Sequence, residues 1–220
     1  MESNKKIDKG FFITFEGGEG AGKSTQVGLL VDELGKRGFN VFRMREPGGT
    51  KLCEELRGLV KHLGGDDAAC PVAEMLIMGA SRAQLVEHEI KPVLQAGDVV
   101  VCDRFMDSTT VYQGYARGLD LDFISAMHEQ SVAEFSPNLT FYLDLDVKVG
   151  MERSRLRMNE NAATDRFEAE SVAFHENVRS GFLELAKLYP QRIKVIDAAR
   201  EQYAVHEQIM GFIDDAFAGI

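Results

Sequence analysis

The sequence contains no tryptophan, only three cysteines and five prolines among its 220 residues, and no apolar run near the roughly 18 residues that cross a bilayer. The longest apolar runs, such as residues 11–15, have the length of a strand, so we expect no membrane partner. The cysteines, Cys53, Cys70 and Cys102, are odd in number and far apart. This spacing fits neither a zinc site nor a disulfide framework and favours a reducing, cytoplasmic compartment. Residues 1–10 lack the apolar core of a secretory signal, and we expect them to form a flexible tail.

Basic residues are also scarce, because 25 Lys and Arg stand against 35 Asp and Glu, which gives a formal net charge of −10. An acidic chain repels nucleic acid unless it carries a local basic patch, so we expect no nucleic-acid partner. Any phosphate chemistry must then take place in a focused pocket. At about 150 residues per domain, this length favours a single domain over residues 1–220.

Short runs rich in Val, Ile and Phe alternate with longer amphipathic stretches. The runs predict five buried strands, at residues 11–16, 40–44, 98–102, 139–145 and 192–197. The stretches predict helices at residues 23–37, 71–95, 119–134, 148–158, 168–188 and 201–218. Such alternation is typical of an α/β fold, in which a parallel sheet carries helices on both faces and binds ligands at the carboxyl ends of its strands.

A glycine-rich segment follows the first predicted strand and precedes the first predicted helix, and it fits the pattern GxxxxGK[ST] of a phosphate-binding loop, or P-loop. Backbone N–H groups of such a loop point at phosphate oxygens, and the helix adds its positive dipole end. We expect ATP to contact the whole segment and the residue after it: Gly17, Gly18, Glu19, Gly20, Ala21, Gly22, Lys23, Ser24 and Thr25. Lys23 should reach the β- and γ-phosphates, while the Ser24 hydroxyl ligates Mg²⁺.

A second polar pair follows the apolar run at residues 99–102. Asp103 is placed as an aspartate that helps to hold Mg²⁺ in P-loop proteins, and Arg104 follows it directly. A guanidinium beside that carboxylate can bridge two phosphates. Together with the P-loop, this pair predicts a three-layer P-loop NTPase fold with a five-stranded parallel sheet.

The sequence favours a phosphotransferase over a GTPase switch, because no guanine-reading NKxD element follows the first strand. A phosphotransferase needs a cover that excludes water and cations that neutralise the transferring phosphoryl group. Residues 151–166 supply a candidate lid with three arginines at alternate positions, Arg153, Arg155 and Arg157.

Over essentially its whole length the chain resembles the thymidylate kinases, which are nucleoside monophosphate kinases. The resemblance is carried by residues 12–26, 45–50, 103–105 and 196–198, by the lid, and by Ser108, Thr109, Tyr112 and Gln113. It implies transfer of the γ-phosphoryl group of ATP to thymidine 5′-monophosphate (dTMP) for dTTP synthesis, with ATP and dTMP as the small-molecule partners. It also implies a homodimer.

The resemblance further implies roles in dTMP binding. Glu19 would accept a hydrogen bond from the sugar 3′-hydroxyl, Arg82 would donate to the thymine carbonyl, and Thr109 would read the base edge. Tyr112 would crowd the 2′ position and disfavour ribonucleotides. The remaining dTMP-binding candidates are Arg45, Glu46, Pro47, Gly48, Met78, Arg104, Ser108 and Gln113.

Within the resemblance, the arrangement of the catalytic arginine and one departure from the family pattern leave alternatives open. The P-loop carries Gly20 where some relatives place a catalytic arginine, so the catalytic arginine is expected among Arg153, Arg155 and Arg157, together with Lys23, Asp103 and Arg104. Met78 stands where the family often has a phenylalanine stacked on thymine. The alternatives are therefore another nucleoside monophosphate kinase and a non-catalytic P-loop regulator.

Overall fold

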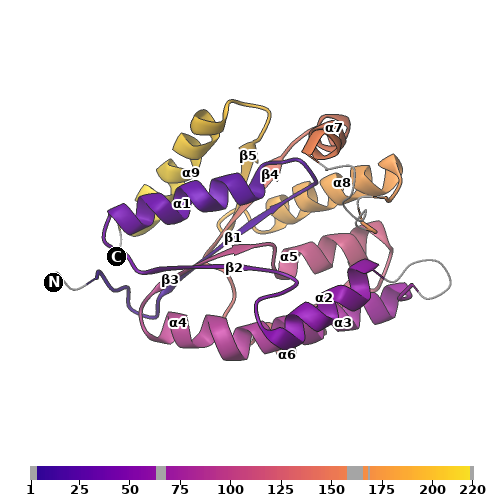
Figure 1. The fold of residues 1–220 in the computed structure, drawn as a ribbon, viewed down its shortest axis with the longest axis horizontal. Coiled ribbons are helices and arrows are strands. Elements are labelled where there is room, and N and C mark those ends of the chain that lie inside the picture. Colours follow the sequence, from indigo (N-terminus) through magenta and orange to yellow (C-terminus); the bar gives the residue numbers. More distant parts are fainter. Residues whose placement is uncertain (1–3, 63–67, 158–165, 168, 219–220) are drawn as a thin grey trace.

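The computed structural model describes residues 4–62, 68–157, 166–167 and 169–218. Five parallel strands form one sheet in the order β2-β3-β1-β4-β5, which confirms the predicted α/β class (Figure 1). The strands are β1 (Phe11–Gly17), β2 (Val41–Arg45), β3 (Val99–Asp103), β4 (Leu139–Asp144) and β5 (Ile193–Asp197). Each lies within one or two residues of its predicted bounds. The predicted burial is confirmed for β1, β3 and β4, whereas β2 at the edge of the sheet has no buried residue and β5 at the other edge is only partly buried.

Helices cover both faces of the sheet because alternate strand residues point to opposite sides. On one face, α1 (Lys23–Lys36) and α9 (Gln202–Phe217) pack on Ile13, Val101 and Phe141. The other face carries α3 (Pro71–Leu85), α4 (Lys91–Gln95) and α8 (Val172–Leu188). The remaining α-helices are α2 (Lys51–His62), α5 (Met106–Thr109), α6 (Leu121–Val132) and α7 (Val147–Arg157). No described helix is long and apolar enough to span a membrane.

Two π-helical segments and the helices α2 and α5 differ from the sequence prediction. The helix predicted over residues 71–95 is interrupted by the π-helix η2 (Val86–Ile90), which joins α3 to α4. Helices α2 and α5 and the π-helix η3 (Thr110–Ala116) were not predicted. π-Helical turns are uncommon and often occur at functional sites, and propensity alone gives little signal for them.

The segment before β1 is packed against the sheet, so the predicted flexible tail is wrong for residues 5–10. Lys5 N donates to Gly38 O (2.8 Å) and Ile7 N donates to Gly97 O (2.9 Å). Ile7 is buried in the core shared with α1 and α9. This contact stabilises the segment because an apolar side chain and two backbone donors leave water together with their partners.

Candidate active site

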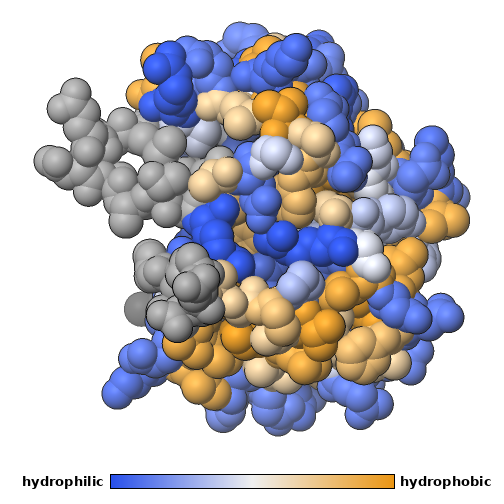
Figure 2. All heavy atoms as spheres, turned by 90° about the vertical axis from the view of Figure 1, so that its right-hand side faces the viewer, coloured by the Kyte–Doolittle hydropathy of each residue, from blue (hydrophilic) through white to orange (hydrophobic). Residues whose placement is uncertain are grey.

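A cavity of about 310 Å³ opens at the carboxyl ends of β1, β2 and β3, on the face shown in Figure 2. The register of the sheet places Arg45, Asp103 and Phe15 side by side across these three strands, two residues before the P-loop begins. The cavity is lined by Glu19, Gly20, Ala21, Gly22, Lys23, Ser24, Arg45, Glu46, Pro47, Arg57, Lys61, Met78, Arg82, Asp103, Arg104, Phe105, Ser108, Thr109, Tyr112, Gln113 and Phe167. Sequence segments far apart in the chain therefore meet in one cavity, as the resemblance implies.

The P-loop glycines satisfy two different requirements. Gly20 and Gly22 have φ values of +70° and +90°, which side chains rarely adopt. A Cβ at Gly20 would also lie 2.1 Å from Gly150 O, because α7 packs its backbone on the loop. An arginine therefore cannot stand at position 20 in this packing, which explains physically why the P-loop carries none.

Lys23 is buried beneath the P-loop at the start of α1. Its Nζ donates to Gly17 O (3.0 Å) and Gly18 O (2.8 Å). Burial and the charge of Arg104 lower the pKa of Lys23 to about 8. A phosphate bound in the loop would bring negative charge to this ammonium and favour its protonated form.

Ser24, in the first turn of α1, is in contact with Asp103 at the end of β3. The Ser24 hydroxyl donates to Asp103 Oδ2 over 2.8 Å. Hydroxyl and carboxylate oxygens are the donors that Mg²⁺ prefers, and Mg²⁺ usually completes its shell with phosphate and water. The pair thus fits the predicted role, although the described residues hold no cluster of three or more His, Cys, Asp or Glu that could bind a metal ion unaided.

Arg104 links the P-loop to the helix that follows β3. Its backbone has a φ of +67°, a left-handed conformation that is strained for arginine. Its guanidinium donates to Gly17 O (3.2 Å), Tyr112 Oη (3.2 Å) and Glu19 Oε1 (2.8 Å). The strain is maintained by this set of hydrogen bonds, which aims a fixed positive charge into the middle of the cavity.

Glu16 of β1 binds the same turn after β3 through hydrogen bonds. This fully buried carboxylate accepts hydrogen bonds from Phe105 N (2.8 Å), Ser108 N (3.2 Å) and Ser108 Oγ (2.6 Å). Burial and the neighbouring Asp107 raise the pKa of Glu16 to about 7. The sequence analysis did not single out Glu16, although a carboxylate inside an otherwise apolar strand is a signal that could have found it.

Glu19 projects from the P-loop toward Arg104. Burial would raise the pKa of its carboxyl, but the positive charges of Arg104 and Lys23 outweigh that effect and lower the pKa to about 2. Glu19 is therefore ionised at neutral pH and can accept a hydrogen bond from a hydroxyl. This is the chemistry that its predicted contact with a sugar 3′-hydroxyl requires.

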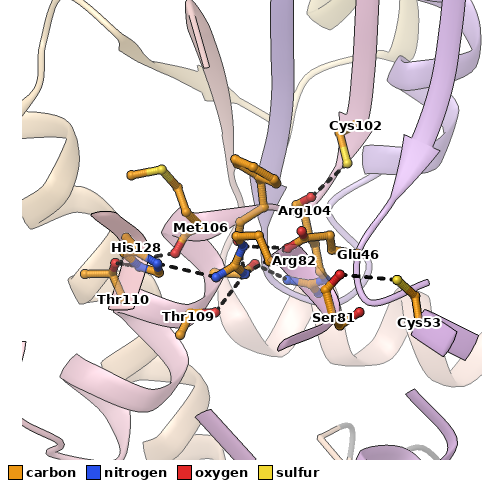
Figure 3. A network of polar contacts seen from close by, with 12 residues as sticks. Glu46, Cys53, Ser81, Arg82, Cys102, Arg104, Met106, Thr109, Thr110 and His128 are labelled. Atoms are coloured by element: carbon orange, nitrogen blue, oxygen red, sulfur yellow. Dashed lines mark hydrogen bonds and ion pairs between the residues drawn. The ribbon is translucent and has the colours of Figure 1, made fainter. Parts of the chain in front are cut away.

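Arg82 forms the centre of a buried polar network on the opposite wall, shown in Figure 3. Its side chain is only 2% exposed, and its Nε and NH2 atoms donate to Glu46 Oε2 over 2.9 and 2.8 Å. NH2 also donates to Thr109 Oγ1 (2.9 Å), and NH1 lies 3.5 Å from His128 Nδ1. Burial lowers the pKa of His128 to about 3, so the imidazole is neutral and can accept from Arg82.

The loop after β2 lies beside this network. Arg45 donates to Pro47 O (2.9 Å) and to Glu54 Oε1 (2.7 Å), and a Cβ at Gly48 would lie 2.4 Å from Arg45. Arg57 of α2 donates to the same Pro47 oxygen. Arg57 and Lys61, one turn apart on α2, both line the cavity. They were missed because α2 was not predicted, although their i,i+4 spacing was visible in the sequence.

Comparison with known proteins agrees with this geometry. The thymidylate kinase family profile matches residues 15–209. A thymidylate kinase from Gloeobacter violaceus is 48% identical over 92% of this chain and 94% of its own length, and one from Caldanaerobacter subterraneus is 40% identical over 96% and 98%. The chain belongs to the thymidylate kinase family.

A solved structure extends the likeness to the fold. The thymidylate kinase from Ehrlichia chaffeensis superposes with a TM-score of 0.73 at 34% identity, covering 93% of this chain and 98% of that one. The predicted P-loop fold of the nucleoside monophosphate kinase type is therefore confirmed for this member of the thymidylate kinase family.

Among the described residues, the cavity lining includes neither Arg153 nor Arg155, two of the lid arginines expected from the thymidylate kinase resemblance. Arg153 donates to Ala198 O (3.2 Å), and Arg155 pairs with Glu152 on the outer side of α7. The Arg157 side chain and residues 158–165 lie outside the described residues. Met78, by contrast, lines the cavity where the family often has phenylalanine.

Proposed function

We propose that this chain is a thymidylate kinase, which transfers the γ-phosphoryl group of ATP to dTMP and forms ADP and thymidine diphosphate. The observation that carries the proposal is one cavity with two differently built walls. One wall is a P-loop with Lys23 and Ser24, which suits a nucleoside triphosphate. The other is a buried polar wall with Arg82 and Thr109, which suits the edge of a base.

The reaction follows from charge and position. Lys23 and the P-loop amides hold the phosphates of ATP, while Arg104 faces the acceptor phosphate between the two walls. An ionised phosphate oxygen of dTMP attacks the γ-phosphorus in line, so the protein needs no strong general base. Its residues instead orient the two nucleotides and neutralise charge that spreads over the transferring group.

Ser24 and Asp103 would hold the Mg²⁺ that accompanies ATP. The ion would supply charge stabilisation on the β- and γ-phosphate oxygens. Support comes from the 2.8 Å contact between the two oxygen donors beside Lys23. A lid arginine from Arg153, Arg155 or Arg157 would add charge once α7 moves toward the cavity.

We propose the following contacts between the protein and dTMP. Glu19 binds the sugar hydroxyl, Arg82 and Thr109 bind the base, and Tyr112 closes the 2′ side. Tyr112 fits this role because its ring is packed edge-on against Phe167 and Phe174, while its hydroxyl accepts from Arg104. Arg57 and Lys61 join Arg45 as the cations nearest to the loop at Pro47.

A homodimer is supported by an apolar surface on three neighbouring helices. Helices α2, α3 and α6 pack side by side (Figure 1). They expose the apolar side chains Leu52, Leu59, Val72, Leu76, Leu121 and Phe123, each 43–50% accessible. Leu76→Glu should shift the protein to monomer in sedimentation, whereas Leu188→Glu, on exposed α8 surface, should not.

A cytoplasmic location remains our proposal as well. All three cysteines, Cys53, Cys70 and Cys102, are free thiols, and two of them are buried. Unpaired thiols are typical of a reducing compartment.

The deciding experiment measures initial rates of ADP formation from ATP and Mg²⁺ with a panel of nucleoside monophosphates. We expect a strong preference for dTMP over ribonucleotides and cytosine nucleotides. A preference for uridine or cytidine monophosphate would assign the chain to another nucleoside monophosphate kinase activity. Binding of ATP with no acceptor-dependent rate would overturn the kinase function in favour of a regulator.

A further inference from the structure

Glu74 is a fully buried carboxylate on α3 that joins three segments. It accepts a hydrogen bond from Gln113 Nε2 of η3 (2.6 Å) and one from Arg117 Nε (2.8 Å). It also pairs with Arg166, the last residue of the candidate lid segment. Its exposed fraction is 0%. Such a group is costly to bury unless its partners satisfy it, and its position one layer behind the cavity invites a functional explanation.

Because the Glu74 carboxylate only accepts hydrogen bonds, it fixes the orientation of the Gln113 side-chain amide. A carboxylate flanked by two guanidinium groups carries no proton to donate, so it can only accept. Gln113 must therefore turn its NH₂ group, not its oxygen, toward Glu74. The amide oxygen then lies on the side of the amide away from Glu74. This orientation follows from the hydrogen-bond network rather than from the shape of the side chain, which is the same for both orientations.

Gln113 is 2% exposed and lines the cavity together with Arg82 and Thr109. Arg82 has only donors, and the Thr109 hydroxyl already accepts from Arg82. The Thr109 hydroxyl keeps a second lone pair and its own hydrogen, so it can face a base as donor or acceptor. Gln113 instead offers an amide oxygen that Glu74 fixes as an acceptor, because Glu74 holds the amide nitrogen. Thymine and uracil carry a hydrogen on ring atom N3, whereas cytosine carries a lone pair there. An amide oxygen recognises the former and repels the latter.

We propose that Glu74 is a positioning residue that sets the base preference by holding the Gln113 amide with its oxygen available to a pyrimidine N3–H. This inference rests on the proposed function and deepens it. The selection needs no contact between Glu74 and the substrate. Because Glu74 also pairs with Arg166, the same carboxylate joins base recognition to the end of the lid segment.

The test compares dTMP with 5-methyl-dCMP, which keeps the methyl group and differs from thymine only at N3 and the adjacent exocyclic group. Glu74→Gln provides an amide that can donate, so the Gln113 amide can rotate. We expect the ratio of kcat/KM for dTMP to that for 5-methyl-dCMP to fall about tenfold, mainly through KM, because a mismatched buried polar group is strongly discriminated. It does not fall to unity, since Arg82 still faces the base.

Glu170→Gln is the matched control. Glu170 pairs with Arg117 over 2.8 Å but does not contact Gln113, and it is partly exposed. This variant should keep the wild-type ratio within about twofold. The double variant Glu74→Gln/Gln113→Glu exchanges the two side chains. The amide at position 74 then donates to the carboxylate at position 113, which keeps an acceptor at position 113. We expect the dTMP preference to return to within about threefold of wild type.

A measurement on the wild-type protein decides the matter if the variants do not fold. In ¹⁵N spectra, the Gln113 side-chain amide, assigned by its loss in Gln113→Glu, should exchange with water far more slowly than that of exposed Gln191. Fast exchange, or an unchanged nucleotide ratio in folded Glu74→Gln, would overturn the inference. A wild-type enzyme with no dTMP-dependent rate would instead overturn the proposed function.

Discussion

The Arg82 wall of the cavity and the candidate lid helix α7 are built in opposite ways. On the base-reading wall, Arg82 is 2% exposed and its donors are held by Glu46 and Thr109. On the lid side, the Arg155 side chain is 69% exposed and pairs with Glu152 on its own helix. The proposed contacts to the base are thus organised before substrate arrives, whereas the proposed lid cation has to move to reach the cavity.

Of the changes that test this comparison, removing a lid arginine should have the largest effect, and the effect should be on kcat. We expect one of Arg153→Ala, Arg155→Ala and Arg157→Ala to lower kcat about 10³-fold, as the loss of an arginine finger does. ATP affinity should stay within about threefold, because Lys23 and the P-loop remain. Single-turnover rates and ATP titrations measure the two quantities, with Arg200→Ala as an exposed control. Wild-type turnover in all three variants would remove the lid arginines from the mechanism.

Breaking the fixed wall should reduce stability as well as dTMP affinity. Arg82→Leu leaves the Glu46 carboxylate buried without its ion-pair partner, which costs about 3–5 kcal/mol of unfolding free energy. Arg155→Ala, at an exposed pair, should leave the free energy of unfolding almost unchanged. Urea unfolding measures both. The double variant Arg82→Leu/Glu46→Leu should recover part of the loss, and equal costs for the Arg82 and Arg155 variants would contradict the contrast.

The sequence predicted the phosphate side better than the base side. Lys23, Ser24 and Asp103 were found because a strand, a glycine-rich loop and a strand-end carboxylate are local patterns whose spacing follows from phosphate geometry. The five strands were found for a similar reason, since each is a short run rich in Val, Ile or Phe that is bounded by glycine, proline or charged residues. The N-terminal segment was wrongly predicted to be flexible, because its packing against Gly97 depends on a single apolar residue, Ile7.

The base side depends on contacts between distant segments. Glu74, Glu16 and His128 act through partners 39, 92 and 18 residues away in the chain, and no local pattern marks such pairs. Met78 and Arg82 were identified by family resemblance, not by periodicity. The π-helix η3, which presents Tyr112 and Gln113 to the cavity, has no reliable propensity signal.

The neutral state of His128 provides a pH test of the fixed wall. Burial and the charges of Arg82 and Arg192 lower its pKa from 6.5 to about 3. The unfolded chain therefore binds a proton below about pH 6.5 that the folded chain does not bind until about pH 3. The free energy of unfolding should fall as pH falls through this window, by up to about 1.4 kcal/mol per pH unit from this group. Urea unfolding measured across this pH window should show a shallower slope for His128→Asn than for the wild-type protein, and an equal slope would contradict the prediction.

The smallest expected effect concerns Met78, where the base-reading wall lacks the aromatic ring common in the family. Met78→Phe should lower KM for dTMP by about two- to tenfold, the range that an added aromatic contact of about 0.5–1.5 kcal/mol gives. The value of kcat should not change, because the contact is made equally in the ground and transition states. Steady-state kinetics provide the measurement, and Leu188→Phe, on the exposed surface of α8, is the control.

An unchanged KM would mean that the base already stacks on another side chain. Phe167, which is buried at the same cavity, is a ring within reach. The fixed wall would then end at Arg82 and Gln113, with stacking supplied by the segment that follows the lid.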